Sequence, residues 1–155
     1  MLSGTGRLVT DGGCPARPDV PIERVLLVDD EAPLVELLTL YLGELGYRVT
    51  GFTAARAALE AFLGAPEAFD ALVSDLSMPH LPGLELADRF LRVRPDLPVV
   101  LTSGWVREEE EAAGRSLGVL GFVAKGSSVE EIVRAIDLLL RGGSSPGAPP
   151  HAAGA

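Results

Sequence analysis

The sequence predicts a doubly wound α/β domain in which five parallel strands alternate with five helices that cover both faces of the sheet. Short apolar runs rich in valine and leucine alternate five times with longer segments of helical periodicity, and turn-forming residues separate them. The apolar runs also lack the polar alternation of a strand with one face in water. Because right-handed crossovers through helices join such strands, the sheet is expected to be parallel and buried on both faces.

The first half of the domain is expected to hold three strands and two helices. Residues 25–28 read Val-Leu-Leu-Val and predict a strand, and from Leu34 to Leu45 apolar residues recur at the three- and four-residue steps of a helix. Pro33 fits the first turn of that helix, where its missing N–H costs nothing. The next elements are a strand, an alanine-rich helix and a strand, at 47–52, 54–63 and 71–74.

The second half continues the same alternation. Pro82 and Gly83 open a helix that extends to about residue 94, since proline is well tolerated in a first helical turn. A strand, a helix and a strand are then expected at 98–101, 106–117 and 119–124. The closing helix presents one apolar face, formed by Val129, Ile132, Val133, Ile136, Leu139 and Leu140. The five strand–helix units predict a flavodoxin-like arrangement.

A single folded domain is expected between two flexible tails. The chain has 155 residues, within the ~100 to 200 residues typical of one domain. Both ends are rich in glycine and proline and lack apolar periodicity, and the last fourteen residues carry no Asp, Glu, Lys or Arg. We therefore place the domain at 21–141 and the tails at 1–20 and 142–155.

The composition argues against several classes of partner. With 13 Lys and Arg against 22 Asp and Glu, the net charge of −9 opposes binding to nucleic acid or to an anionic membrane and favours a cation. The single cysteine, Cys14, excludes an internal disulfide, as expected in a reducing compartment. No apolar run approaches the roughly 18 residues of a transmembrane helix, and no signal peptide is recognisable, so a cytoplasmic location is expected.

Polar residues gather where the predicted strands end. In an open parallel sheet the reactive groups lie at the carboxyl ends of the strands, near the change in strand order. The residues at these ends are Asp29, Asp30 and Glu31 after the first strand, Asp75 and Ser77 after the third, Thr102 and Ser103 after the fourth, and Lys125 after the fifth. We expect their side chains to converge at one edge of the sheet.

Three aspartates at one edge would repel one another and raise each other's pKa unless a cation lies between them. Carboxylate ligands without histidine or cysteine nearby suit Mg²⁺, which commonly bridges a carboxylate and a phosphoryl oxygen. Asp75 is then the candidate nucleophile, which would form an acyl phosphate, while Lys125 and the Ser103 hydroxyl would bind phosphoryl oxygens. The sequence thus predicts a site for phosphoryl transfer that needs Mg²⁺.

Four sequence motifs resemble those of the receiver domain of two-component response regulators. They are Val-Asp-Asp-Glu at 28–31, Val-Ser-Asp-Leu-Ser-Met-Pro at 73–79 followed by Pro-Gly-Leu-Glu-Leu at 82–86, Pro-Val-Val-Leu-Thr-Ser-Gly at 98–104, and Gly-Phe-Val-Ala-Lys at 121–125. They occur in the order and at the spacing usual in that family, over residues 24–141. One position departs from the pattern, because Gly126 follows the lysine where the family usually has proline.

The resemblance implies roles for five side chains. Asp75 would be the phosphoacceptor, Ser103 the switch hydroxyl and Lys125 the phosphate-binding lysine. Phe122 matches the aromatic switch position on the fifth strand. Trp105, two residues after Ser103, is expected at the rim of the site, where it would limit the access of water to the phosphoryl group.

The resemblance also implies a metal site. Asp29 and Asp30 would hold Mg²⁺, Asp30 more directly, together with Asp75. The backbone carbonyl of Ser77 would supply a further ligand. The expected cofactor is therefore Mg²⁺ alone.

By the same resemblance, the phosphoryl donor is a phosphohistidine on a sensor histidine kinase or a histidine phosphotransfer protein. Phosphorylation would change the surface of the domain, and this surface would act on a downstream protein target. A homodimer is a further possible assembly. Such a domain is not an enzyme, except that it catalyses its own phosphorylation and dephosphorylation. The sequence does not decide between a receiver that stands alone and one that belongs to a hybrid kinase.

Two alternative functions are weighed against this hypothesis. One is an Mg²⁺-dependent hydrolase of the haloacid-dehalogenase kind, but the Asp-x-Asp signature of that family is missing after the first strand, where Asp-Asp-Glu stands. The other is a pseudo-receiver that binds partners without turning over phosphate. The intact set of acidic residues argues against it.

Overall fold

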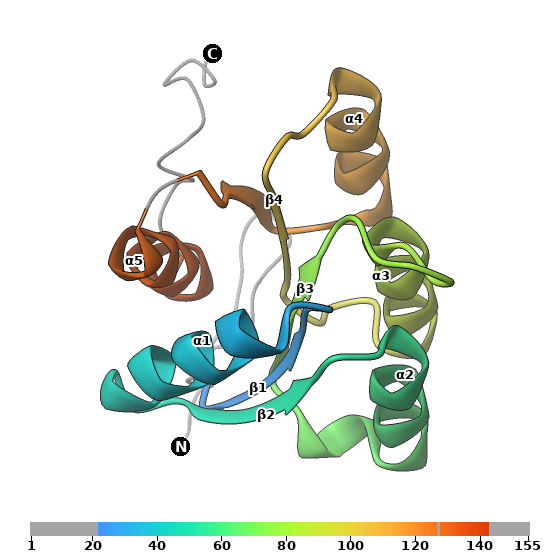
Figure 1. Cartoon of the computed structure of the whole chain (residues 1–155). Helices are drawn as coiled ribbons and strands as arrows, with labels where there is room; N and C mark the ends of the chain where they lie inside the picture. The colour runs from blue at the N-terminus through green and yellow to red at the C-terminus, as the bar shows by residue number, and fades with distance from the viewer. Residues whose placement is uncertain (1–21, 127, 143–155) are drawn as a thin grey trace, which may run out of the picture.

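The computed structural model describes residues 22–126 and 128–142, which form a five-stranded parallel sheet in the order β2-β1-β3-β4-β5 (Figure 1). The strands are β1 (Arg24–Val28), β2 (Arg48–Phe52), β3 (Ala71–Asp75), β4 (Val99–Ser103) and β5 (Gly121–Ala124). The predicted fold class is confirmed. The flexible tails predicted at 1–20 and 142–155 lie outside the described residues, except for Gly142.

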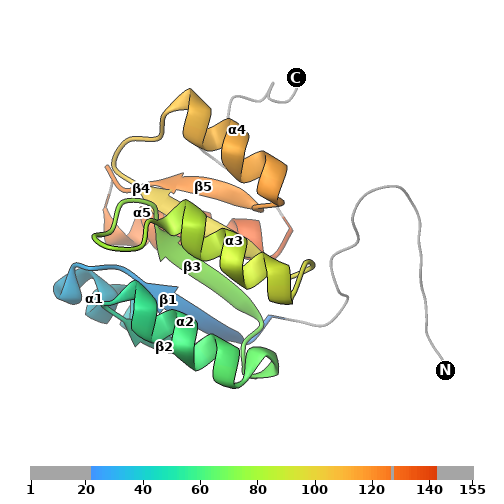
Figure 2. The same cartoon turned by 90° about the vertical axis from the view of Figure 1, so that its right-hand side faces the viewer.

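Helices cover both faces of this sheet. They are α1 (Ala32–Glu44), α2 (Ala55–Gly64), α3 (Gly83–Val93), α4 (Glu108–Leu117) and α5 (Val129–Leu140), with a short 3-10 helix η2 (Pro66–Ala68) after α2. Helices α1 and α5 lie on one face, and α2, α3 and α4 lie on the other (Figures 1 and 2). In the described part of the chain, no helix is long and apolar enough to cross a membrane.

The side chains of the inner strands alternate between two apolar clusters. Leu26 and Leu72 pack in the cluster under α2 and α3, whereas Val25 and Val73 pack in the cluster under α1 and α5. Strands β1, β3 and β4 are buried along nearly their whole length. Strand β2 is exposed or half-buried at every position, because an edge strand has a neighbour on one side only. The expected burial on both faces therefore applies to the inner strands.

Three boundaries near β4 and β5 differ from the prediction. Strand β4 continues beyond residue 101, because Thr102 still pairs with Asp75 of β3. The helix expected from residue 106 begins at Glu108. Strand β5 begins at Gly121 rather than at residue 119, because Gly118 ends α4 with a left-handed φ of 98° and the chain needs two more residues to enter the sheet.

The loop after β3 is held tightly against the edge of the sheet. Gly83 begins α3, and its N–H donates to the Leu76 carbonyl oxygen at 2.9 Å. A Cβ at this position would collide with the Asp75 carbonyl oxygen. His80, within the loop, has a left-handed φ of 73°, which costs a side chain about 1 to 2 kcal/mol. The loop thus fixes the position at which β3 presents its last residue, Asp75.

Candidate functional site

Three carboxylates meet at the carboxyl ends of β1 and β3. These strands are neighbours, so the residues that follow them lie at the same edge of the sheet. Asp29, Asp30 and Asp75 each offer one oxygen, and these three oxygens lie within 4.8 Å of one another. Asp29 and Asp75 are 1% and 5% exposed, whereas Asp30 is open to solvent. The convergence predicted for the three aspartates is therefore found in the structure.

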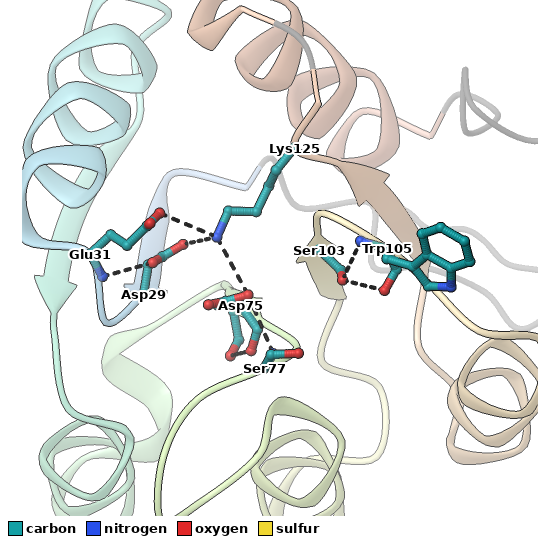
Figure 3. Close-up of polar contacts among 8 residues, drawn as sticks. Asp29, Glu31, Asp75, Ser77, Ser103, Trp105 and Lys125 are labelled. Carbon is teal, nitrogen blue, oxygen red and sulfur yellow. Dashed lines mark hydrogen bonds and ion pairs between the residues drawn. The ribbon is translucent and has the colours of Figure 1, made fainter.

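Lys125 reaches across the sheet from the end of β5 to these carboxylates (Figure 3). Its Nζ lies 2.8 Å from Asp29 Oδ2, 3.5 Å from Asp75 Oδ1 and 3.8 Å from Glu31 Oε1. Burial lowers the pKa of Lys125, but the hydrogen bond to Asp29 and the charges of the three acids outweigh burial and raise this pKa above its usual value. Lys125 thus reaches the acidic cluster although glycine, Gly126, follows it in place of the proline usual in the family.

The Asp75 carboxyl is buried beside a second carboxylate, that of Asp29. Burial, followed by the charge of Asp29, raises the pKa of Asp75 to about 6. Lys125 and the Ser77 N–H, which donates to Asp75 Oδ1 at 3.3 Å, act in the opposite direction. A buried carboxyl with a raised pKa stores unfavourable charge energy, which a bound cation would relieve.

Ser103 directs its hydroxyl to its own turn. Its Oγ donates to the Trp105 carbonyl oxygen at 2.7 Å and accepts the Trp105 N–H at 3.0 Å. Trp105 is 79% exposed, and Figure 3 shows its indole ring pointing away from Asp75. The backbone of this turn, rather than the indole ring, therefore faces the acidic cluster.

Phe122 lies away from the carboxylates, under helix α4. It is half-buried on β5 and packs against the cluster beneath α2 and α3. Its ring is so close to Gly114 of α4 that a Cβ there would lie 2.5 Å from Phe122 Cζ. The structure therefore places Phe122 where the position of α4 depends on the ring.

A cavity of about 830 Å³ opens above the acidic cluster. We call it the site cavity, and its lining residues are Asp30, Glu31, Asp75, Ser77, Ser103, Gly104, Trp105, Arg107, Glu110 and Lys125. The sequence predictions gave no role to Arg107 and Glu110. Arg107 directly precedes α4 and Glu110 lies in its first turn, and helical periodicity alone does not show that this end of the helix borders the cavity.

A doubly wound sheet that gathers three carboxylates and a lysine at one edge is an arrangement suited to phosphoryl transfer and to a divalent cation. The chain belongs to the response regulator receiver domain family, which it matches over residues 25–137. It is thus a receiver domain of two-component response regulators, a signalling module. Phosphorylation of an aspartate and Mg²⁺ binding in an acidic pocket are general features of this family. The match favours the receiver over the hydrolase alternative.

Similar proteins support this assignment. The chain is 29% identical to the transcriptional regulatory protein QseB of Haemophilus influenzae over 76% of its length, and 34% identical to the transcriptional activator protein PfeR of Pseudomonas aeruginosa over 79%. It spans 52% and 39% of those proteins, about half their length or less. The non-phosphorylated receiver domain of HemR from Leptospira biflexa has a similar structure, with a TM-score of 0.70 at 29% identity, over 76% of this chain and 94% of that domain.

Proposed function

We propose that Asp75 accepts a phosphoryl group from a phosphohistidine on a sensor histidine kinase or a histidine phosphotransfer protein. The observation that carries this proposal is the position of the Asp75 carboxylate, which lies within the acidic cluster and 3.5 Å from Lys125 Nζ. A carboxylate in such a place can attack phosphorus, because positive charge beside it offsets the charge of the phosphoryl oxygens.

The acidic cluster fits a hard divalent cation. Its donors are carboxylate oxygens within 4.8 Å of one another, and such oxygens are the ligands that Mg²⁺ prefers. Mg²⁺ would be held by Asp29, Asp30, Asp75 and the backbone carbonyl oxygen of Ser77. Lys125 forms an ion pair with Asp29, whereas Asp30 is exposed and forms none with this lysine. Bound there, Mg²⁺ would neutralise charge on the phosphoryl oxygens.

In the transfer step, an Asp75 carboxylate oxygen attacks phosphorus and forms the O–P bond. The N–P bond of the phosphohistidine breaks, and its electron pair stays on the imidazole nitrogen. The Lys125 ammonium group moves from Asp29 to a phosphoryl oxygen. The Ser103 hydroxyl stops donating to the Trp105 carbonyl oxygen and donates to a second phosphoryl oxygen instead. Hydrolysis by water would later release phosphate. The only chemistry that the domain catalyses is therefore its own phosphorylation and dephosphorylation.

The proposed output is a change in the surface around α4 and β5. A Ser103 hydroxyl that leaves the Trp105 turn loosens the segment leading into α4, and Phe122 packs under that helix. A downstream protein target or a second copy of the chain would recognise the changed surface.

Intact-mass spectrometry tests the assignment of Asp75. With acetyl phosphate and Mg²⁺, the wild type should gain one phosphate, and Asp75→Asn should gain none. Asp88→Asn, a change on α3 outside the site cavity, is the matched control and should be labelled like the wild type. An Mg²⁺-dependent adduct on Asp75→Asn would show that another residue is the phosphoacceptor.

A further inference from the structure

The site cavity has a second cation, Arg107, which no step described so far uses. Arg107 lines the cavity together with Asp75 and Lys125, but it comes from the segment before α4 rather than from β5. Several other arginines pair with acids, such as Arg24 with Asp70. Across residues 22–126 and 128–142, Arg107 makes no ion pair with an acidic side chain.

The other cation of the cavity, Lys125, is already engaged. It makes its shortest contact, 2.8 Å, with Asp29 and also lies 3.5 Å from Asp75. The cavity lining holds two cations, Lys125 and Arg107, and four carboxylates, those of Asp30, Glu31, Asp75 and Glu110. The buried carboxylate of Asp29 beside them is a fifth. An incoming phosphoryl dianion therefore meets net negative charge, so an unpaired guanidinium at the cavity wall would attract it.

The backbone of Arg107 is fixed although its side chain is not paired. Its N–H donates to Glu110 Oε1 at 3.0 Å, and its carbonyl oxygen accepts the Glu111 N–H at 2.9 Å. The first contact occupies the Glu110 carboxylate at the start of α4 and so competes with a Glu110–guanidinium pair. The backbone of Arg107 is thus held at the cavity wall, and its exposed side chain makes no ion pair among the described residues.

We propose that Arg107 is a positioning residue that binds the phosphoryl oxygens of the incoming donor and steers them toward Asp75. This inference rests on the function proposed for Asp75. A guanidinium stays charged at every physiological pH, and its planar fork of N–H donors matches a pair of phosphoryl oxygens. Arg107 thereby supplies from the β4–α4 side the positive charge that Lys125 supplies from β5.

The rate of phosphorylation by acetyl phosphate tests this role. The second-order rate constant for labelling of Asp75, followed by intact mass at saturating Mg²⁺, should fall about fivefold to tenfold in Arg107→Ala. Arg107→Lys should recover part of the loss, since it restores the charge without the fork. Arg115→Ala removes an exposed arginine of α4 that does not line the site cavity, so it should react like the wild type. Added salt should reduce the difference between Arg107→Ala and the wild type.

Mg²⁺ affinity, measured by calorimetry, separates attraction of the phosphoryl group from structural damage. Loss of a positive charge should slow phosphorylation yet strengthen Mg²⁺ binding, whereas a distorted site would weaken both. Weaker Mg²⁺ binding in Arg107→Ala, or an unchanged rate constant, would overturn the inference alone. Failure of the wild type to be labelled at Asp75 would instead overturn the proposed function, and this inference with it.

Discussion

Helices α4 and α5 flank the same edge strand, β5, yet they are held to the sheet in very different ways (Figure 2). Helix α5 buries five apolar side chains, Ile132, Val133, Ile136, Leu139 and Leu140, in the cluster that it shares with α1, and it contacts β4 and β5 of the sheet. The only buried residue of α4 is Gly114, which rests on the ring of Phe122. Buried apolar area is the main source of attachment, so α5 is firmly attached and α4 is not.

Polar contacts add to the difference. Tyr47 is 7% exposed, and its hydroxyl donates to Asp137 Oδ1 of α5 at 2.6 Å. Ser128 caps α5 by accepting the Glu131 N–H at 3.3 Å. Weakly packed elements open at low free energy, and these are the elements that can move during signalling. The α4 side, next to Ser103 and Arg107, is therefore the more weakly packed side of the domain.

The largest effect is expected from deleting apolar contacts of α5. Ile136→Ala should lower the free energy of unfolding by about 2 to 5 kcal/mol, because Ile136 is fully buried and leaves a cavity. Leu117→Ala in α4, where the side chain is only half-buried, should cost less than about 1 kcal/mol. Urea denaturation measures both values. Equal losses would contradict the stronger attachment of α5.

The next largest effect concerns the charge of Asp75 in the acidic cluster. The raised pKa of Asp75, about 6 against 3.8 in the unfolded chain, means that the folded protein binds this proton more tightly. Without Mg²⁺, the stability of the wild type therefore falls as pH rises from about 4 to 6. Asp75→Asn should be more stable by up to about 3 kcal/mol above pH 6, and the gain should vanish near pH 4.

Thermal melts in EDTA between pH 4 and 8 check this prediction. Asp30→Asn is the control, since Asp30 is exposed and should give a smaller gain at neutral pH. A gain for Asp75→Asn that does not change with pH would show that charge repulsion is not its source.

The Tyr47 hydroxyl contributes a polar contact that holds α5. Tyr47→Phe should cost about 0.5 to 1.5 kcal/mol, because Asp137 loses a buried hydrogen-bond donor. Tyr41→Phe on α1 is the matched control, since the Tyr41 hydroxyl forms no hydrogen bond among the described residues. Denaturant titrations that show equal stability for the two variants would contradict a role of this bond in holding α5.

The smallest change in stability is expected at Gly114. Replacement of a helical glycine by alanine normally gains about 0.5 to 1 kcal/mol, but here the added Cβ would meet the Phe122 ring at 2.5 Å and offset the gain. Gly43→Ala in α1, where nothing lies within 4 Å, should show the full gain. NMR shifts of the Phe122 ring should change in Gly114→Ala. Unchanged shifts would mean that α4 is not held by this ring.

Much of the fold could be predicted because its signals are local. Apolar runs, helical periodicity and turn residues located all five strands and all five helices described, and right-handed crossovers place the ends of parallel strands at one edge. The meeting of Asp29, Asp30 and Asp75 follows from that rule alone. Errors fell at the ends of elements, as at Gly118, where one left-handed residue delays the start of β5.

The class of fold, and the edge at which the acidic residues and the lysine gather, can thus be predicted from the amino-acid sequence. Three features could be seen only in the folded structure: Lys125 makes its shortest contact with Asp29 rather than Asp75, the Ser103 hydroxyl bonds to the Trp105 turn, and Arg107 lines the site cavity. These features could not be predicted because they depend on tertiary packing rather than on local periodicity. Periodicity reports the backbone conformation of neighbouring residues, whereas the contact between Lys125 and Asp29 joins residues 96 positions apart and depends on how whole strands and loops pack.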